Sequence, residues 1–83
     1  MNKYYLYILE CFDQTLYTGI TTDLERRVIE HNTNNLGAKY TKCRRPVKLI
    51  YHKKFDNRSE ATKEEARIKK LTRQQKVAII KNI

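Results

Sequence analysis

The chain is poor in cysteine, glycine and proline, and these shortages exclude several classes of protein. Its 83 residues include two Cys, two Gly, one Pro and no Trp. Cys11 and Cys43 form no C-x-x-C pair and belong to no His/Cys cluster with the spacing of zinc ligands. We therefore expect two reduced thiols and no zinc site. No Gly-, Ser- or Pro-rich linker and no internal repeat is present, so we expect residues 1–83 to form one domain with a modest core.

Long apolar runs are also lacking. The longest are only a few residues, so no segment is predicted to cross a bilayer. The first residues open into a strand-like pattern instead of the charged and apolar regions of a signal peptide. We therefore predict a cytoplasmic location, close to the nucleoid, and no membrane partner.

Acidic residues are scarce in the second half of the chain. The net charge is +9, with −2 on residues 1–36 and +11 on residues 37–83. A basic half of this size attracts polyanions, because contacts with phosphates release counterions from a nucleic acid. A solvated surface with no such partner is the alternative. The charge favours a nucleic acid over a small-molecule substrate, and leaves room for a protein partner.

The first twenty residues predict a β-hairpin. The aromatic and β-branched segment 4–9 favours a strand, residues 12–15 a turn, and residues 16–21 a second strand. In strand periodicity Tyr5, Tyr7 and Leu9 share one face of the sheet.

Helices and one further strand follow. Thr22 and Glu25 match a capping box, so a helix is predicted from there to about Asn32. Pro46 can precede a strand over residues 47–52. Ser59 is the predicted N-cap of a helix that runs to about residue 71, and Thr72 caps a last helix over residues 73–81. The order β-β-α-β-α-α predicts an α+β fold with a three-stranded, mainly antiparallel sheet and helices on one face.

The first helix carries unusual residues beside its apolar stripe. Leu24, Arg27, Val28 and His31 lie at i, i+3, i+4 and i+7. Because Leu24 and Val28 must face the sheet, Arg27 and His31 should flank the core. Both have structural alternatives: Arg27 could keep its head in water, and His31 could cap the helix C-terminus.

Either of two carboxylates on the later helix could point toward the core. Glu65 lies in an arc of small residues, whereas Glu64 projects on the side of Leu71. Periodicity leaves the choice open, and either acid could instead pair with a cation one turn away, as Glu65 could with Lys69.

Together these residues resemble the GIY-YIG nuclease superfamily, and in particular its small stand-alone bacterial members. The resemblance covers nearly the whole chain and lies in an ordered set: Tyr5-Leu6-Tyr7, Tyr17-Thr18-Gly19, Arg27, His31, a later Glu, and the phrases over residues 16–27 and 68–73. Tyr5 and Leu6 stand where the name-giving pattern has Gly and Ile.

The resemblance implies a set of catalytic roles. Tyr7 or Tyr17 would lie close to the attacking water, with its pKa lowered by positive neighbours or the metal, because a phenol with a pKa of about 10 is a poor base. Arg27 would clamp the scissile phosphate, and His31 would hydrogen-bond a tyrosine or relay the proton. Glu65, aligned with the metal-binding glutamate of the family, would hold Mg²⁺ or Mn²⁺.

We therefore predict a GIY-YIG-type endonuclease, a phosphodiester hydrolase acting in DNA repair or recombination on branched, flapped or single-stranded DNA. A nucleic-acid-binding module without turnover, or one that depends on a partner, is the alternative. Substrate contacts are expected from Gly19, which permits close approach, and from cations with one aromatic: Lys39, Tyr40, Lys42, Arg44, Arg45 and Arg73.

Overall fold

The computed structural model describes residues 3–33, 41 and 44–81 of the chain. The elements, in order, are β1 (Tyr4–Glu10), β2 (Leu16–Thr21), α1 (Leu24–Thr33), β3 (Lys48–Phe55), α3 (Arg58–Lys69) and α4 (Arg73–Lys81). This confirms the predicted β-β-α-β-α-α order and the α+β class. The third strand runs three residues further than the predicted 47–52, because Lys53, Lys54 and Phe55 continue the pairing with β1.

The sheet has the strand order β2-β1-β3, and both strand pairs are antiparallel. The hairpin places Tyr7 opposite Gly19 and Leu9 opposite Tyr17. A register irregularity between Ile8 and Leu9 interrupts the pairing of β1 with β3. β1 is therefore the central strand, and residues 6–9 of it are almost completely buried.

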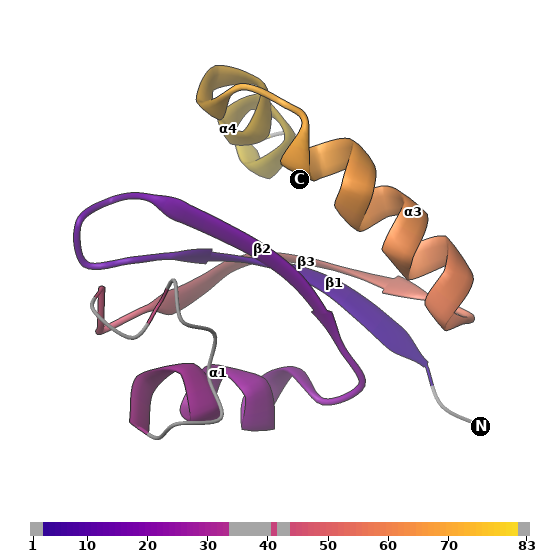
Figure 1. Cartoon of the computed structure of the whole chain (residues 1–83), viewed down its shortest axis with the longest axis horizontal. Coiled ribbons are helices and arrows are strands. Elements are labelled where there is room, and N and C mark those ends of the chain that lie inside the picture. Colours follow the sequence, from indigo (N-terminus) through magenta and orange to yellow (C-terminus); the bar gives the residue numbers. More distant parts are fainter. Residues whose placement is uncertain (1–2, 34–40, 42–43, 82–83) are drawn as a thin grey trace.

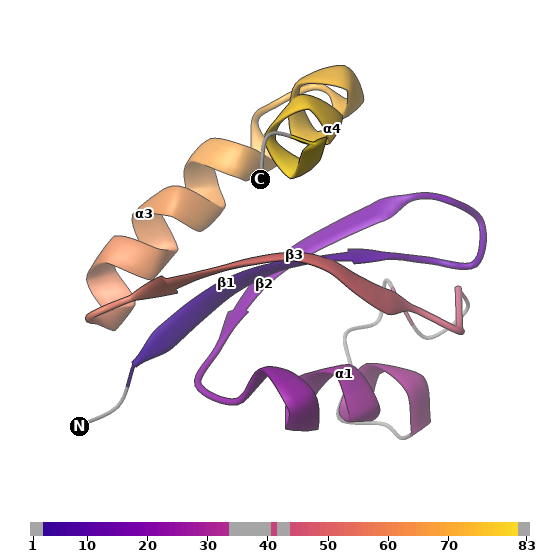
Figure 2. The same ribbon diagram turned by 180° about the vertical axis from the view of Figure 1, so that it is seen from behind.

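Helices cover both faces of this sheet. In Figure 1, α1 lies on one side of the strands and α3 and α4 lie on the other, and the reverse view in Figure 2 shows the same layers. The prediction of helices on one face was wrong. Side chains of β1 alternate between the two faces, Tyr7 and Leu9 toward one and Leu6 and Ile8 toward the other, and all four are apolar or aromatic. Each face of the sheet must therefore be buried by helices.

Two separate apolar clusters fill these two layers. The cluster on the α1 side is built around Tyr7, Leu9, Cys11 and Val47, with Leu24, Val28, Tyr17 and Leu49 packed against it. The cluster on the α3 and α4 side is built around Leu6, Ile8 and Ile68, with Leu71, Ile79 and Ile80 among its neighbours. Cys11 is a buried free thiol, as expected; Cys43 lies outside the described residues.

The helix caps differ from the predicted ones at two of three positions. The carboxylate Oδ1 of Asp23, not the Thr22 hydroxyl, accepts from the backbone N–H of Arg26 at 3.0 Å. Asn57, not Ser59, caps α3 by accepting from the Glu60 N–H at 2.9 Å.

At α4 the predicted cap is confirmed. Thr72 Oγ1 accepts from the Gln75 N–H at 3.2 Å, and the Gln75 side chain accepts from the Thr72 N–H at 2.9 Å. Within the described part of the chain, no helix has the length and apolar character needed to cross a membrane.

Candidate active site

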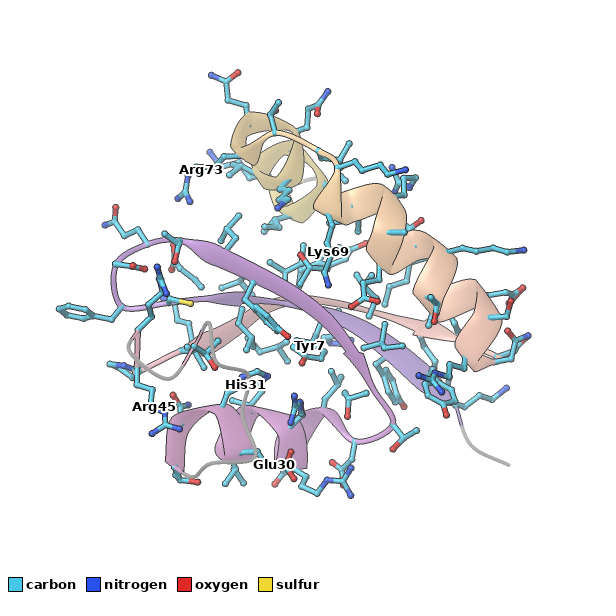
Figure 3. All side chains as sticks on the ribbon, in the orientation of Figure 1. Tyr7, Glu30, His31, Arg45, Lys69 and Arg73 are labelled. Carbon is cyan, nitrogen blue, oxygen red and sulfur yellow. The ribbon has the colours of Figure 1, made fainter. Side chains whose placement is uncertain are left out.

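The layer between the sheet and α1 holds the tyrosines, the arginine and the histidine. β1 and β2 direct Tyr7 and Tyr17 into this layer, and the predicted stripe of α1 brings Arg27 and His31 up to them. Figure 3 shows the Tyr7 side chain extending from the strands toward His31 on α1. Leu24 and Val28 anchor the helix against the same apolar cluster, which fixes the direction of the two polar side chains.

A hydrogen-bonded chain runs through this layer. Tyr7 Oη lies 3.0 Å from His31 Nε2, and His31 Nδ1 lies 2.7 Å from Thr41 Oγ1. Arg27 Nε donates to Tyr7 Oη at 3.4 Å. Since the phenolic oxygen accepts from Arg27, its own proton is available for Nε2, and Nδ1–H then donates to the Thr41 hydroxyl. With this tautomer, every member of the chain is satisfied.

Aromatic rings lie beside this hydrogen-bonded chain, on the side of the hairpin. The Tyr17 ring centroid lies 5.2 Å from that of His31 and 6.4 Å from that of Tyr7. The Tyr7 and His31 rings meet edge to face at 5.9 Å. These separations are those of favourable aromatic pairs. The rings therefore help to fix the orientation of the imidazole.

His31 is held neutral. Its side chain is completely buried, and this burial, together with the positive charge of Arg27 and, to a lesser extent, that of Arg45, lowers its pKa from 6.5 to about 4, although the negative charge of Glu30 opposes the shift. At neutral pH the imidazole therefore keeps a lone pair on one ring nitrogen and can accept a proton.

Tyr7 is also held neutral, contrary to the expectation of a lowered pKa. Burial raises the pKa of its phenol, and the hydrogen bond from Arg27 opposes this without overcoming it. The neighbouring groups of the protein alone therefore do not produce a phenolate. Any proton that Tyr7 accepts has to be matched by one that it gives up.

Arg27 links the buried chain to the surface. Its Nη1 donates to Glu30 Oε1 at 2.9 Å, while its Nε faces Tyr7, and a quarter of its side chain stays exposed. The guanidinium is therefore oriented at both edges and still accessible to a phosphate. The alternative in which Arg27 keeps its head in open water does not hold.

The capping alternative for His31 does not hold either. The His31 ring turns into the buried layer, and Arg45 takes the position at the C-terminus of α1 by donating its Nε–H to the His31 carbonyl at 2.6 Å. Arg45 thus stabilises the helix end that carries the histidine, and Figure 3 shows it beside that end.

Glu65 approaches from the other layer, on α3. Its carboxylate pairs with Lys69 at 3.2 Å, and α3 lies on the side of the sheet opposite α1 (Figure 1). Its charge nevertheless raises the pKa of Tyr7 as the smallest of several contributions. The guanidinium of Arg67 holds Glu64, and lowers the pKa of that carboxyl. Of the two acids, Glu65 is the one whose field reaches the phenol.

A single carboxylate fits one kind of metal site. Magnesium keeps several of its waters and takes its remaining ligands from one or two carboxylates and the substrate phosphates. Glu65 is partly exposed and could serve in this way. Residues 3–33, 41 and 44–81 contain no group of three His, Cys, Asp or Glu side chains placed to hold an ion by themselves. The donor set therefore suits a hydrated ion bound together with substrate, and not a closed zinc site.

Gly19 makes room for Tyr7. A Cβ atom at this position would lie 2.6 Å from Tyr7 Oη and 2.7 Å from Tyr7 Cζ. The phenol therefore lies across the backbone of β2 at a place that only glycine leaves open. On this face the protein's own ring makes the close approach to Gly19.

The remaining predicted substrate contacts divide into two groups. Lys39, Tyr40 and Lys42 lie outside the described residues. Arg44 and Arg73 both reach the turn between β1 and β2: Arg44 Nε donates to Asp13 Oδ2 at 3.0 Å, and Arg73 Nη1 donates to the Gln14 carbonyl at 2.5 Å.

Thr41 and Glu30 belong to the site but were not predicted. Glu30 lies at i+3 from Arg27 on the same helix, so helical spacing could have predicted that these two side chains pair. Thr41 follows α1 by eight residues in a polar segment, where periodicity gives no direction for a side chain. A lone threonine has no spacing that would reveal it.

Tyr7, Arg27 and His31 thus meet in one layer of a small α+β domain. Residues 3–78 match the GIY-YIG catalytic domain, so the chain belongs to the GIY-YIG family. The family is a nuclease superfamily, and its domain implies binding to nucleic acid.

The relatives are small bacterial proteins of similar length. The UPF0213 protein of Syntrophus aciditrophicus is 54% identical over 81 residues, which are 98% of this chain and 93% of that protein. That of Staphylococcus saprophyticus is 54% identical over 80 residues, 96% of each. The solution NMR structure of protein EF2693 from E. faecalis is similar with a TM-score of 0.67 at 49% identity, over 99% of this chain and 86% of that one.

Proposed function

We propose that this chain is a metal-dependent endonuclease that hydrolyses phosphodiester bonds in DNA. The observation that carries the proposal is the position of Tyr7 Oη, which lies within reach of both Arg27 Nε and His31 Nε2. A phenol between a cation and a neutral base can pass a proton along without becoming a free phenolate. Phosphodiester hydrolysis needs an activated water, and such a group can accept the proton of that water.

Water activation follows from the protonation states. As the water attacks phosphorus, its proton moves to Tyr7 Oη while the phenolic proton moves to His31 Nε2. The bond from phosphorus to the leaving oxygen then breaks. Because the pKa of Tyr7 is raised and that of His31 is lowered, both groups start neutral at pH 7. When a phosphate neutralises the charge of Arg27, one cause of the low pKa of His31 is weakened, so the imidazole becomes a better base on substrate binding.

Arg27 is the proposed phosphate clamp. Its planar fork of donors suits two phosphoryl oxygens, and its contacts with Glu30 and Tyr7 fix the plane of the guanidinium before substrate arrives. Such preorganised charge stabilises the transition state in phosphoryl transfer. Glu65 would hold Mg²⁺ or Mn²⁺, which when bound would take up charge on the phosphate and on the leaving oxygen.

The preferred substrate would be branched, flapped or single-stranded DNA. The described chain offers no recognition helix for base readout, whereas its cations are spread over α3, α4 and the segment before β3. Such a surface tolerates many sequences and responds to the path of the backbone. Equal affinity for a forked and a plain duplex at matched salt would contradict this preference.

The test is cleavage of end-labelled flapped and single-stranded oligonucleotides with Mg²⁺, Mn²⁺ or EDTA. Glu65→Gln is compared with Glu64→Gln, since both acids lie on α3, are similarly exposed and pair with a cation of the same helix, and only Glu65 is the proposed metal ligand. We expect metal-dependent cutting that is lost in Glu65→Gln and in Arg27→Ala and is kept in Glu64→Gln.

Two outcomes would contradict the proposal. DNA binding without cutting under any metal would make the chain a binding module, with or without a partner subunit. Equal loss in Glu64→Gln and Glu65→Gln, with lowered thermal stability in both, would make Glu65 a structural acid of α3.

A further inference from the structure

The turn between β1 and β2 displays a large aromatic side chain. Phe12 is 74% exposed, and in the described part of the chain the only other large hydrophobic side chain so exposed is Ile29. Ile29 lies on α1, on the acidic first half of the chain. Phe12 lies instead where two basic segments from the second half converge.

The turn is held in one conformation by its own hydrogen bonds. The Cys11 N–H donates to the Thr15 carbonyl and the Gln14 N–H to the Cys11 carbonyl, both at 2.9 Å. Asp13 Oδ1 accepts from the Thr15 hydroxyl at 2.6 Å and from the Thr15 N–H at 3.1 Å. The backbone that carries Phe12 is therefore fixed, and little conformational entropy remains to be lost when the ring is covered.

Two arginines from distant parts of the chain form hydrogen bonds with this turn. The Phe12 N–H donates to the Arg44 carbonyl at 2.9 Å, and the Arg44 side chain pairs with Asp13. Arg73, at the start of α4, donates to the Gln14 carbonyl. Figure 1 shows α4 and the turn at the same end of the molecule, and Figure 3 places Arg73 there. The turn that carries the exposed Phe12 side chain is therefore contacted by two arginine side chains and contains one carboxylate, Asp13.

This combination suits a nucleobase better than a protein side chain. A base offers a flat π surface to the ring, and its phosphates lie within reach of the flanking cations. The +11 charge of residues 37–83, which supply both arginines, favours an anionic partner over a hydrophobic protein surface. We propose that Phe12 stacks on an unpaired base of the bound DNA, with Arg44 and Arg73 beside the adjoining phosphates.

The turn is connected to the active-site layer by short strands. Phe12 is five residues from Tyr7 along β1 and five from Tyr17 along the other arm of the hairpin, a span of at most about 17 Å. This corresponds to about five nucleotides at the spacing of one strand of a duplex. A single strand of DNA lying along the hairpin could therefore contact both the layer that holds Tyr7 and the Phe12 ring. This inference rests on the proposed function, because it names the part of the substrate that the surface recognises.

The experiment measures affinity and stacking on the same flapped DNA, with EDTA to prevent cutting. Phe12→Ala should weaken binding to flapped DNA by about 5- to 150-fold, the range expected for loss of one stacked base, and should leave binding to plain duplex within about twofold. Phe12→Trp should retain the affinity of the wild type. Ile29→Ala is the matched control, since it removes the other exposed apolar side chain.

A 2-aminopurine base, moved one position at a time along the flap, should be quenched by the wild type at one or two positions, and not by Phe12→Ala. Unchanged affinity and unchanged quenching in Phe12→Ala, with metal-dependent cleavage intact, would overturn this inference alone. Such a result would leave Phe12 as a contact for a protein partner. Failure of the wild type to bind any DNA would overturn both this inference and the proposed function.

Discussion

The Tyr7 phenol keeps its place because the strand beside it carries no side chain at Gly19. The phenolic oxygen would otherwise meet a Cβ at 2.6 Å, which is well inside van der Waals contact. At the scale of single residues, the proposed chemistry thus depends on one missing methyl group and on the buried partners of His31.

Gly19→Ala should therefore displace the Tyr7 ring from His31. We expect a loss of stability of about 1–3 kcal/mol, the usual cost of an overpacked core, together with a large fall in cleavage rate. Urea denaturation measures the first and single-turnover cleavage the second. The double variant Gly19→Ala/Tyr7→Phe should regain part of the stability, because it removes the atom nearest to the new methyl group. If the two substitutions instead lower the free energy of unfolding additively, the Tyr7 hydroxyl is not the group that the new methyl group contacts.

Thr41 fixes the tautomer of His31. Both side chains are fully buried, so replacing Thr41 with Val leaves Nδ1 without its partner at a cost of about 1–3 kcal/mol. Thr41→Ser keeps the hydroxyl and should behave like the wild type. The ¹⁵N shifts of the His31 ring should report a protonated Nδ1 in the wild type and in Thr41→Ser, and a changed tautomer mixture in Thr41→Val. Identical ring shifts in all three proteins would contradict the assignment.

At the scale of elements, the sequence predicted the type and order of every helix and strand in the described chain, but not the N-caps of α1 and α3. The N-terminus of α3 offered Asn57 and Ser59, both good caps by residue type. The choice depends on where the chain leaves β3, and that is set by the pairing of Lys53, Lys54 and Phe55 with β1. Local sequence signals do not contain this information.

Asn57→Ala should lower the free energy of unfolding by about 1 kcal/mol, because it removes the acceptor of the Glu60 N–H. Ser59→Ala is the matched control and should change it by less than about half as much. The comparison needs only thermal or urea unfolding curves. An equal effect of the two substitutions would contradict the assignment of the cap.

At the scale of the whole molecule, a buried neutral histidine makes stability depend on pH. The pKa of His31 is about 4 in the folded protein, against the ordinary histidine value of 6.5 that applies to the unfolded chain. Between these values the unfolded chain binds more protons than the folded one, so stability falls as the pH is lowered from about 6.5 to 4. The loss from this one group is at most about 3 kcal/mol.

His31→Gln should therefore show a shallower decline in unfolding free energy between pH 7 and pH 4.5 than the wild type. His52→Gln, which changes an exposed histidine, should keep the full slope. Parallel slopes in all three proteins would show that His31 is not a buried neutral group.

The site was only partly predictable because its parts come from both layers of the fold. Helical spacing and strand alternation place Arg27, His31 and Tyr7 correctly, since each depends on local periodicity. Which of Glu64 and Glu65 turns toward the sheet depends on how α3 packs, and the raised pKa of Tyr7 depends on its burial. Neither can be read from spacing along the chain.

The central claim is that the Tyr7 phenol carries the proton of the attacking water. The most direct measurement is the single-turnover rate of Tyr7→Phe against the wild type, on flapped DNA with saturating protein and Mg²⁺. The account predicts a loss of at least about 100-fold in rate, with DNA affinity and thermal stability nearly unchanged. A Tyr7→Phe protein that cuts within about threefold of the wild-type rate would contradict it.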